Sequence, residues 1–353
     1  MHVAHVCRSG WPAIGGIESA VQGLAAALVR RGHDATVVTL DRAPDGARLH
    51  PAVHQGVVYR RLARVGPRRF PFAQGLTPHL RDADIVHVHG IDGLVHQVAR
   101  VEPAARVGLS THGGFFHTPR HRWLKWAVWR AVTCPTLRGL DAVWFSSAAD
   151  AERFGSDVAG RVVPNGIDGA RYAGPDRRPC VDRWAVLGRV VPHKGLADLL
   201  EVLRRQRDPV PELDVIGPID EAGRAWLQQG SEGLSTRIRV WGSRSVRFVA
   251  ARLARAAWVV FPSRYEGFGL AALEVMAAGV PAIVADIPAL GDAVARGGGQ
   301  RVDFRDPTRA ASALDAIRAL GVAEAIGEQA RVAALRADWG VRVEGFLQAY
   351  EAA

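Results

Sequence analysis

Two glutamates, Glu266 and Glu274, stand eight positions apart around the sequence Gly267-Phe268-Gly269-Leu270. The segment follows an apolar run typical of a buried strand and opens a helical pattern in which small alanines recur. Backbone N–H groups at the start of a helix bind phosphate well, and a carboxylate can accept hydrogen bonds from two hydroxyls. The segment therefore predicts a site for a phosphorylated ligand rich in hydroxyls, and a pair of ordinary surface acids is the alternative.

Two cations, Arg189 and Lys194, lie five residues apart in Gly188-Arg189 and His193-Lys194-Gly195, again between a predicted strand and a predicted helix. From one loop they can converge on a diphosphate, since Arg offers a planar fork of donors and Lys a point charge. Only two lysines occur in the whole chain, and one of them is here. We expect an anion site rather than a solvated basic turn.

A third candidate is Gly15-Gly16-Ile17-Glu18, between the first predicted strand and the first predicted helix. Two glycines let the backbone approach a ligand closely, at a helix N-terminus that favours anions. The pattern is not the G-x-G-x-x-G fingerprint, which argues against a nicotinamide dinucleotide. A tight turn without a ligand is the alternative.

His112 begins a Gly- and Phe-rich segment, His112 to Thr118, directly after a predicted strand. Open α/β sheets bind ligands beyond the carboxyl ends of their strands. His112 is therefore expected to meet a bound sugar through its ring or its backbone carbonyl, with a helix-capping or core histidine as the alternative.

His87 and His89 share one face of a predicted strand and could form a metal pair. No third ligand has convincing spacing, so we favour structural packing. The sequence contains no Ser-His-Asp motif and no P-loop. It predicts neither a bound metal nor a cofactor.

A basic and aromatic segment, Pro119–Ala131, places Trp123, Trp126 and Arg130 near one helical face. Such an amphipathic helix suits a membrane surface that carries negative charge. Packing against the core of the first domain is an equally good explanation of the pattern.

The elements that must position these residues are strands and helices in alternation. Continuous β-branched runs predict strands buried on both faces, and amphipathic patterns such as Val21, Leu24, Ala25 and Leu28 predict the helices between them. The predicted strands form two series: Val3–Cys7, Thr36–Leu40, Ile85–His89, Val107–Thr111 and Ala142–Phe145, then Trp184–Leu187, Leu213–Ile216, Ile238–Trp241, Trp258–Phe261 and Ala282–Ala285. Two series of βα units predict an α/β protein of two doubly wound, Rossmann-like domains.

The chain length of 353 residues also favours two domains. A stretch rich in Pro, Gly and charge near Tyr172–Pro179 predicts the boundary, so we expect domains at 1–173 and 180–335. The last helical stretch, 336–353, has no strand after it.

The bulk composition is that of an ordinary globular protein with a net charge of +10. Most of the charge excess falls in the first half, which suits an anionic lipid or a phosphorylated ligand; no nucleic-acid-binding motif accompanies it. The chain has no leader pattern, no apolar run long enough to cross a bilayer, and three cysteines without paired spacing. These features predict a cytoplasmic protein with reduced thiols.

Taken together, these motifs resemble those of the family 4 glycosyltransferases, which have the GT-B fold and retain the configuration of the sugar. The matching motifs span residues 15 to 288 and are Gly15-Gly16-x-Glu18, Pro164-Asn165-Gly166-Ile167-Asp168, Gly188-Arg189-x4-Lys194-Gly195 and Glu266-x7-Glu274. The segment Ser110–Thr118 is also similar to that of exopolysaccharide α-1,3-mannosyltransferases, which use GDP-mannose and a polyprenyl-diphosphate-linked acceptor. The turn after Leu290 departs from the family pattern, with Gly291-Asp292 where the family often has a Glu.

The resemblance implies a role for each candidate residue. Arg189 and Lys194 would neutralise the donor diphosphate, Glu274 would hold the ribose, and Glu266 and His112 would lie by the sugar. The remaining donor-binding residues would be Gly15, Gly16, Trp241, Gly242, Gly267, Phe268, Gly269 and Leu270. The two domains would face a cleft, and the terminal helix, 336–353, would cross back to the first domain.

Two alternatives stay open. One is the same fold with a UDP-glucose or UDP-N-acetylglucosamine donor. The other is a non-catalytic partner that binds a nucleotide sugar within an assembly complex. Peripheral attachment to the inner face of the plasma membrane through Trp123, Trp126 and Arg130 accompanies the favoured reading, in which the partners are GDP-mannose and a lipid-linked glycan.

Overall fold

The computed structural model describes the chain from Met1 to Ala353 apart from residues 14, 43–45, 68–69, 102, 114–121 and 296. It forms two compact units. Unit 1 contains Met1–Ile167 together with Trp339–Ala353, and unit 2 contains Asp168–Asp338. The chain thus leaves unit 1 just before the Pro- and Gly-rich stretch that the sequence suggests as a boundary.

Unit 1 is built on an eight-stranded sheet in the order β10-β9-β8-β7-β1-β2-β4-β3. All neighbours are parallel except β3 and β4. The strands are β1 (His2–Val6), β2 (Asp34–Leu40), β3 (Ala52–His54), β4 (Val57–Leu62), β7 (Ile85–His89), β8 (Arg106–Ser110), β9 (Ala142–Phe145) and β10 (Arg161–Val162), with a separate hairpin of β5 (Arg64–Val65) and β6 (Phe72–Ala73).

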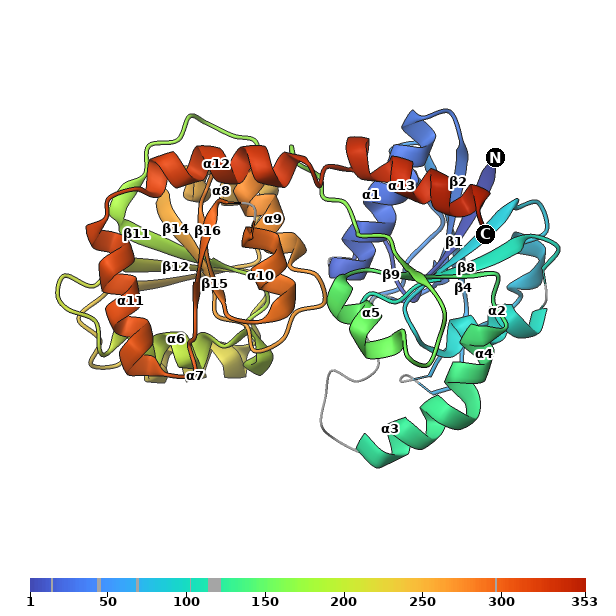
Figure 1. Ribbon diagram of the computed structural model, residues 1–353, viewed down its shortest axis with the longest axis horizontal. Coiled ribbons are helices and arrows are strands. Elements are labelled where there is room, and N and C mark those ends of the chain that lie inside the picture. Colours follow the sequence, from blue (N-terminus) through green and yellow to red (C-terminus); the bar gives the residue numbers. More distant parts are fainter. Residues whose placement is uncertain (14, 43–45, 68–69, 102, 114–121, 296) are drawn as a thin grey trace. The chain divides into compact units, whose positions relative to one another are not determined.

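Helices lie on both sides of this sheet (Figure 1). They are α1 (Gly16–Arg30), α2 (Gly93–Val101), α3 (Arg122–Val128), α4 (Cys134–Arg138), α5 (Ala148–Phe154) and α13 (Trp339–Glu351), with a 3-10 turn at Thr77–His79 and a π-helix at Trp129–Thr133. The predicted apolar face of α1 is confirmed, because Val21, Leu24, Ala25 and Leu28 are all buried.

Helix α13 packs along α1 (Figure 1), although the whole of unit 2 separates them in sequence. The close approach depends on Gly23, because a Cβ there would lie 1.9 Å from Nε1 of Trp339. At the other end of α13, the buried Tyr350 hydroxyl lies 2.8 Å from Nδ1 of His87 in β7. The terminal helix therefore supplies part of the core of unit 1.

Unit 2 is built on a six-stranded parallel sheet in the order β13-β12-β11-β14-β15-β16. Its strands are β11 (Cys180–Leu187), β12 (Glu212–Ile216), β13 (Ile238–Gly242), β14 (Ala256–Phe261), β15 (Ala282–Ala285) and β16 (Gly299–Val302). Its helices are α6 (Leu196–Leu203), α7 (Glu221–Gly230), α8 (Val246–Leu253), α9 (Leu270–Ala277), α10 (Pro288–Val294), α11 (Pro307–Ala319) and α12 (Ala323–Leu335), with a 3-10 turn at Pro192–Lys194. They also cover both faces of the sheet (Figure 1).

Both strand orders are those of doubly wound sheets, so the predicted α/β fold class is confirmed. In such sheets the order reverses at a switch point, beyond which ligands bind. The switch lies between β1 and β7 in unit 1 and between β11 and β14 in unit 2. Arg189 and Lys194 follow β11, Glu266 follows β14, and Gly15 and Gly16 follow β1.

Candidate active site

The loops after β11 and β14 meet at the switch point of unit 2. Gly195 allows this contact, because a Cβ at this position would lie 1.9 Å from the carbonyl oxygen of Pro262. The backbone N–H of Arg264 donates to the carbonyl of His193 at 2.9 Å and ties the two loops together. Any side chain at position 195 would separate the two predicted motifs.

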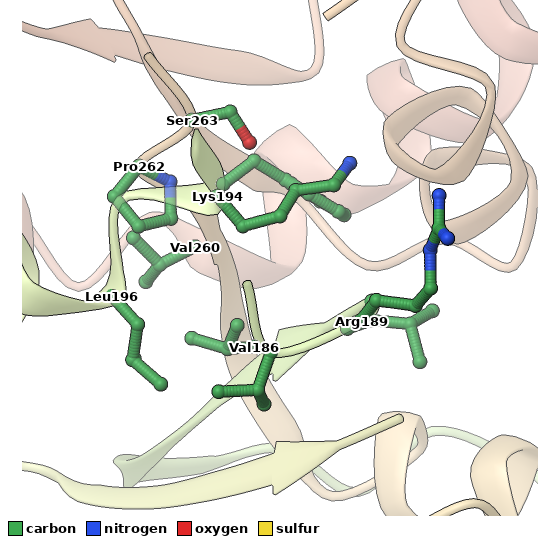
Figure 2. A pocket seen from close by; sticks show the side chains of 11 residues that line it. Val186, Arg189, Lys194, Leu196, Val260, Pro262 and Ser263 are labelled. Carbon is green, nitrogen blue, oxygen red and sulfur yellow. The ribbon is translucent and has the colours of Figure 1, made fainter. Parts of the chain in front are cut away.

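Arg189 and Lys194 both line a pocket at this point, together with Pro262, Ser263 and apolar side chains of the two strands. In Figure 2 the charged ends of Arg189 and Lys194 lie on the same side of the pocket. Arg189 is exposed, and across the described part of the chain it forms no ion pair. A guanidinium held open to solvent beside an ammonium group is suited to an incoming anion.

Glu266 is held by two neighbours at the rim of the pocket. Its Oε1 accepts from Nζ of Lys194 at 2.5 Å and from Oγ of Ser263 at 2.8 Å. The side chains of Lys194 and Glu266 retain 24% and 16% of their exposure, so water screens the pair only in part. The structure thus brings together one predicted cation and one predicted acid that are 72 positions apart.

Helix α9 begins at Leu270, after Gly267, Phe268 and Gly269. Gly269 precedes its first turn with φ at +81°, in the left-handed region that favours glycine. A Cβ at Gly269 would also press on the side chain of Leu290 at 3.1 Å. The backbone N–H groups of the first turn, from Leu270 on, lack intrahelical acceptors in any helix and are the predicted phosphate donors.

Glu274 is buried in α9 and is only 8% exposed. Burial raises the pKa of its carboxyl to about 7; Arg171 opposes this rise and Asp168 adds to it. Nη1 of Arg171 lies 3.4 Å from Oε1 of Glu274. Close to neutrality this acid can therefore exist in either charge state.

Trp241 and Gly242 end β13. The indole N–H of Trp241 donates to Oδ1 of the buried Asp214 at 2.8 Å. The guanidinium of Arg252 lies 4.1 Å from the centre of the indole ring, at the distance of a cation–π contact. These contacts hold the side chain of Trp241 in place.

In unit 1, Gly15 and Gly16 lead into α1. Gly15 is extended, with φ at −178°, and the space beside the Gly16 Cα is open. Glu18 in the first turn accepts a hydrogen bond from Oγ of Ser9, which follows β1. The acid of this motif therefore ties the loop to the strand end.

His112 follows β8 and has a backbone φ of +50°. Its ring contacts His89 and Asn165, and its backbone N–H donates to Oγ of Ser146 at 3.0 Å. Beside it, the buried Asp150 accepts from Oγ1 of Thr111 at 2.8 Å and from the backbone N–H of Gly113 at 2.9 Å. The rest of the predicted segment, Gly114–Thr118, lies outside the described residues.

The strand pair His87 and His89 has a third histidine beside it. His5 in β1 pairs in register with His87, and a ligating nitrogen from each ring lies within 4.8 Å of the others. All three rings are buried. Spacing along the chain could not reveal His5, because it reaches the pair only through the adjacency of β1 and β7.

Comparison with known proteins assigns the chain to a family. Residues 14–171 match the model described as Glycosyltransferase Family 4, and residues 183–332 match Glycosyl transferases group 1. The GDP-mannose:cellobiosyl-diphosphopolyprenol alpha-mannosyltransferase of Xanthomonas campestris is 33% identical over 100% of this chain and 97% of its own. The chain belongs to the family 4 glycosyltransferases.

Two further comparisons agree with this. The Komagataeibacter xylinus protein of the same name is 32% identical to this glycosyltransferase over 81% of this chain and 76% of its own. Sucrose-phosphate synthase from Thermosynechococcus elongatus has the same fold, with a TM-score of 0.78, 20% identity and coverage of 99% of this chain and 98% of that one. The predicted GT-B fold and hexosyltransferase class are thereby confirmed.

Helix α3 carries the predicted membrane-facing residues of this glycosyltransferase and projects from unit 1 (Figure 1). Trp123 and Trp126 are 75% and 58% exposed, and Arg130, just beyond the helix, places its guanidinium 5.3 Å from the Trp126 ring centre. Core packing, the alternative, fits Trp129, which is buried and donates to Oδ2 of Asp157 at 2.7 Å. It does not fit Trp123 or Trp126.

None of the described helices is both long enough and apolar enough to cross a membrane.

Two residues act on Glu274 in a way that the sequence did not predict. Arg171 contacts Glu274 across 103 positions, and Asp168 affects the pKa of the same acid. The sequence signal nearest to them is the Pro164–Asp168 motif, which Asp168 ends and Arg171 follows. Without the fold, nothing in that motif pointed to α9.

Proposed function

We propose that this glycosyltransferase transfers mannose from GDP-mannose to a hydroxyl of a polyprenyl-diphosphate-linked glycan in exopolysaccharide biosynthesis. The carrying observation is the 33% identity, over the whole chain, with a Xanthomonas campestris protein whose name states that donor and acceptor class. The relative from Komagataeibacter xylinus bears the same name.

In this proposal the donor diphosphate lies against Arg189, Lys194 and the first turn of α9. This assignment is supported by their position, because all three follow β11 or β14, the two strands at the switch point. Loss of a diphosphate leaving group is the main barrier, and fixed positive groups lower it without a metal ion. Glu274 takes the ribose hydroxyls, Trp241 and Gly242 flank the base, and the Gly15–Gly16 loop covers the phosphates.

The transferred sugar is assigned to Glu266, Phe268 and His112. The bond between the sugar C1 and the phosphate oxygen breaks, and a bond from C1 to the acceptor oxygen forms on the same face. The acceptor proton passes to the departing phosphate, so the α configuration is retained. Burial lowers the pKa of His112 to about 4, which leaves its ring neutral near pH 7 and favours a positioning role. Mass-spectrometric trapping of a covalent mannosyl group on Glu266 would overturn this mechanism.

A donor panel tests the proposed specificity. The chain is incubated with GDP-mannose, UDP-glucose or UDP-N-acetylglucosamine and a polyprenyl-diphosphate cellobiose acceptor, and the lipid product is analysed by mass spectrometry. Transfer from GDP-mannose alone is expected. Efficient transfer from a UDP-sugar overturns the donor assignment. Donor binding with neither transfer nor slow hydrolysis assigns the chain instead to a non-catalytic role in an assembly complex.

We also propose that α3 rests on an anionic membrane, at the inner face of the plasma membrane where a polyprenyl acceptor is presented. The support is the exposure of Trp123 and Trp126 beside the charge of Arg130. Indole rings settle at the bilayer interface, and Arg attracts acidic headgroups.

Vesicle sedimentation tests this contact. Combined replacement of Trp123, Trp126 and Arg130 by Ala should lower binding to phosphatidylglycerol vesicles by about tenfold or more, since each group contributes roughly 1 kcal/mol or more. Trp226→Ala is the matched control, because Trp226 is also exposed but belongs to α7 of unit 2. Equal binding of the triple variant and the unaltered chain removes α3 from the proposal.

A further inference from the structure

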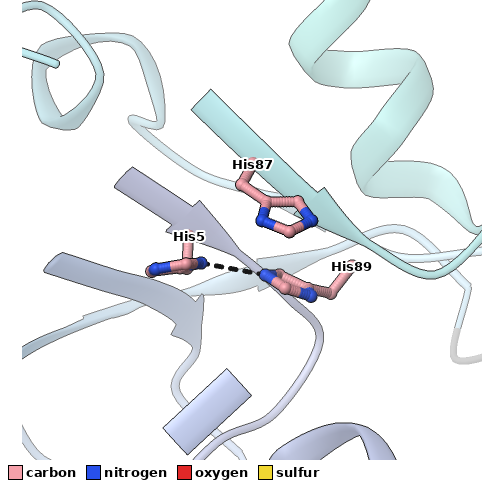
Figure 3. Close-up of side chains that lie close together, drawn as sticks. All are labelled: His5, His87 and His89. Atoms are coloured by element: carbon pink, nitrogen blue, oxygen red, sulfur yellow. Dashed lines mark hydrogen bonds between the residues drawn. The ribbon is translucent and has the colours of Figure 1, made fainter. Parts of the chain in front are cut away.

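A row of hydrogen-bonded rings runs through the centre of unit 1. Nδ1 of His5 lies 2.9 Å from Nε2 of His89, and Nδ1 of His89 lies 3.0 Å from Nε2 of His112. Nδ1 of His112 in turn lies 3.3 Å from the amide nitrogen of Asn165. Figure 3 shows the first of these bonds, with His87 beside it. The row thus joins β1, β7, the end of β8 and the Pro164–Asp168 motif.

The three rings of the row are neutral. Burial lowers the pKa of His5 to about 3 and that of His112 to about 4, and it lowers the pKa of His89 well below its usual range. A neutral imidazole has one N–H donor and one nitrogen that accepts. Each bond between two rings therefore needs a donor on one side and a lone pair on the other.

The amide nitrogen of Asn165 sets the direction of the row. It can only donate, so Nδ1 of His112 accepts and the proton of that ring sits on Nε2. Nε2–H of His112 then donates to Nδ1 of His89, and Nε2–H of His89 donates to Nδ1 of His5. The row ends at Nε2–H of His5, which is buried and has no partner among the described residues.

His112, the ring that contacts Asn165, occupies a strained backbone position. His112 has φ at +50°, a conformation that residues other than glycine seldom adopt. It lies at the carboxyl end of β8, on the side of the sheet where ligands bind in this fold class. Strained residues of this kind persist where surrounding contacts hold them, and they gather at functional sites.

We propose that His89 and His5 are positioning residues for sugar transfer: the one-way row fixes the His112 ring as its Nε2–H tautomer and holds the His112 backbone in its left-handed conformation. The effect on activity rests on the proposed function, in which His112 lies by the transferred sugar. The tautomer itself is independent of that function.

His87 is a neighbour of the row but not part of it. Its ring stacks on His89 with centroids 3.9 Å apart, while its nitrogens lie 2.8 Å from the Tyr350 hydroxyl and 2.8 Å from Oγ of Ser110. With both His87 nitrogens engaged, the three-histidine cluster is explained by hydrogen bonding. His87 is therefore a control in the same buried layer.

Substitutions at His89 separate the two halves of the row. In His89→Asn the amide oxygen replaces Nδ1 and can still accept from His112. In His89→Gln the amide nitrogen replaces Nε2 and can reach His5, but nothing accepts from His112. We expect kcat for mannosyl transfer to fall on the order of 10-fold in His89→Gln, with KM for GDP-mannose changed less than about twofold, and to be largely restored in His89→Asn. His87→Gln should leave kcat within about threefold.

Nitrogen-15 NMR of histidine-labelled protein gives the second readout. The long-range proton–nitrogen pattern should identify His112, His89 and His5 as Nε2–H tautomers in the unaltered chain. The His112 pattern should stay the same in His89→Asn and change in His89→Gln. An Nδ1–H tautomer at His112, or equal effects of the two substitutions, overturns the proposal. A chain that lacks mannosyl transfer but shows the expected tautomers refutes the proposed function and leaves the row intact.

Discussion

The residues beyond the strand ends are held by ion pairs in unit 2 and by hydrogen bonds between neutral groups in unit 1. In unit 2 each of the two candidate acids contacts a cation, Glu266 with Lys194 and Glu274 with Arg171. In unit 1 the candidate His112 sits in a row of neutral rings and an amide. An ion pair can exchange partners when another anion arrives, whereas a row of directional hydrogen bonds resists any change.

The contrast matches the two parts of a nucleotide sugar. The diphosphate is charged and gains charge as it leaves, so it needs positive groups held beside it. The sugar is uncharged, and its position matters more than its electrostatics. In the proposed function, unit 2 therefore supplies charged side chains beside its pocket, and unit 1 supplies a fixed arrangement of hydrogen bonds.

The largest expected effect tests the charged residues of unit 2. Lys194→Ala should lower kcat/KM for the donor by about 100-fold, because a charge-assisted hydrogen bond contributes roughly 1.5–3 kcal/mol. Arg264→Ala is the control, since Arg264 belongs to the adjoining loop but pairs with Asp198 at a side-chain exposure of 60%. We expect less than about a threefold change there. Similar losses in both variants would mean that loop structure, and not charge, sets the effect.

An intermediate effect concerns Glu274 and pH. In the proposed function the ionised carboxylate of Glu274 accepts both ribose hydroxyls, so with a pKa of about 7 the donor affinity should rise by up to about tenfold between pH 6 and pH 8. Glu274→Gln should bind donor weakly and without this rise, as measured by calorimetric titration at each pH. Glu328→Gln, an exposed acid of α12, should keep it. A pH-independent affinity in the unaltered chain would contradict the role given to Glu274.

The same acid affects stability with the opposite sign. The pKa of folded Glu274 is about 7, whereas the ordinary pKa of a glutamate is 4.5. The folded chain then binds more protons, so this group's contribution to the free energy of unfolding falls as pH rises from about 4.5 to 7. Denaturant titrations should show that part of the fall disappear in Glu274→Gln.

The smallest expected effect on donor use concerns the uncharged hydrogen bonds of unit 1. Tyr350→Phe removes the hydroxyl that contacts Nδ1 of His87 and should lower the free energy of unfolding by about 1–3 kcal/mol, with KM for the donor unchanged. Arg31→Ala breaks the exposed pair between α1 and Glu344 of α13 and should cost less than about 1 kcal/mol. Equal changes in melting temperature would show that burial does not distinguish these two contacts.

Much of the fold was predictable because its central strands are continuous apolar runs. Ile85–His89 and Ala142–Phe145 have the predicted bounds. The strands that were missed are β3, β4, β5, β6, β10 and β16. They lie at or next to a sheet edge or form the separate hairpin, and β4 and β16 contain arginines that face solvent. With one side open to water, they lack the pattern that marks a doubly buried strand.

The candidate site divides in the same way. Arg189, Lys194, Glu266 and Glu274 follow their own strands closely, so a local motif suffices to find them. His5 meets His89 across 84 positions, and Arg171 meets Glu274 across 103. Such pairs depend on strand order and on where the chain crosses between units, which no local pattern specifies.

Because α13 belongs to unit 1, the fold of unit 1 can be completed only after unit 2 has been synthesised. Ribosomes make Trp339–Ala353 after the whole of unit 2, which is a continuous segment and can fold as it emerges. Until then Gly23 of α1 lacks Trp339, and the buried ring of His87 lacks the hydroxyl of Tyr350. The nascent first half therefore leaves the exit tunnel with the strands of its sheet but without the helix that packs along α1, and chaperones can reach the side chains that α13 later covers.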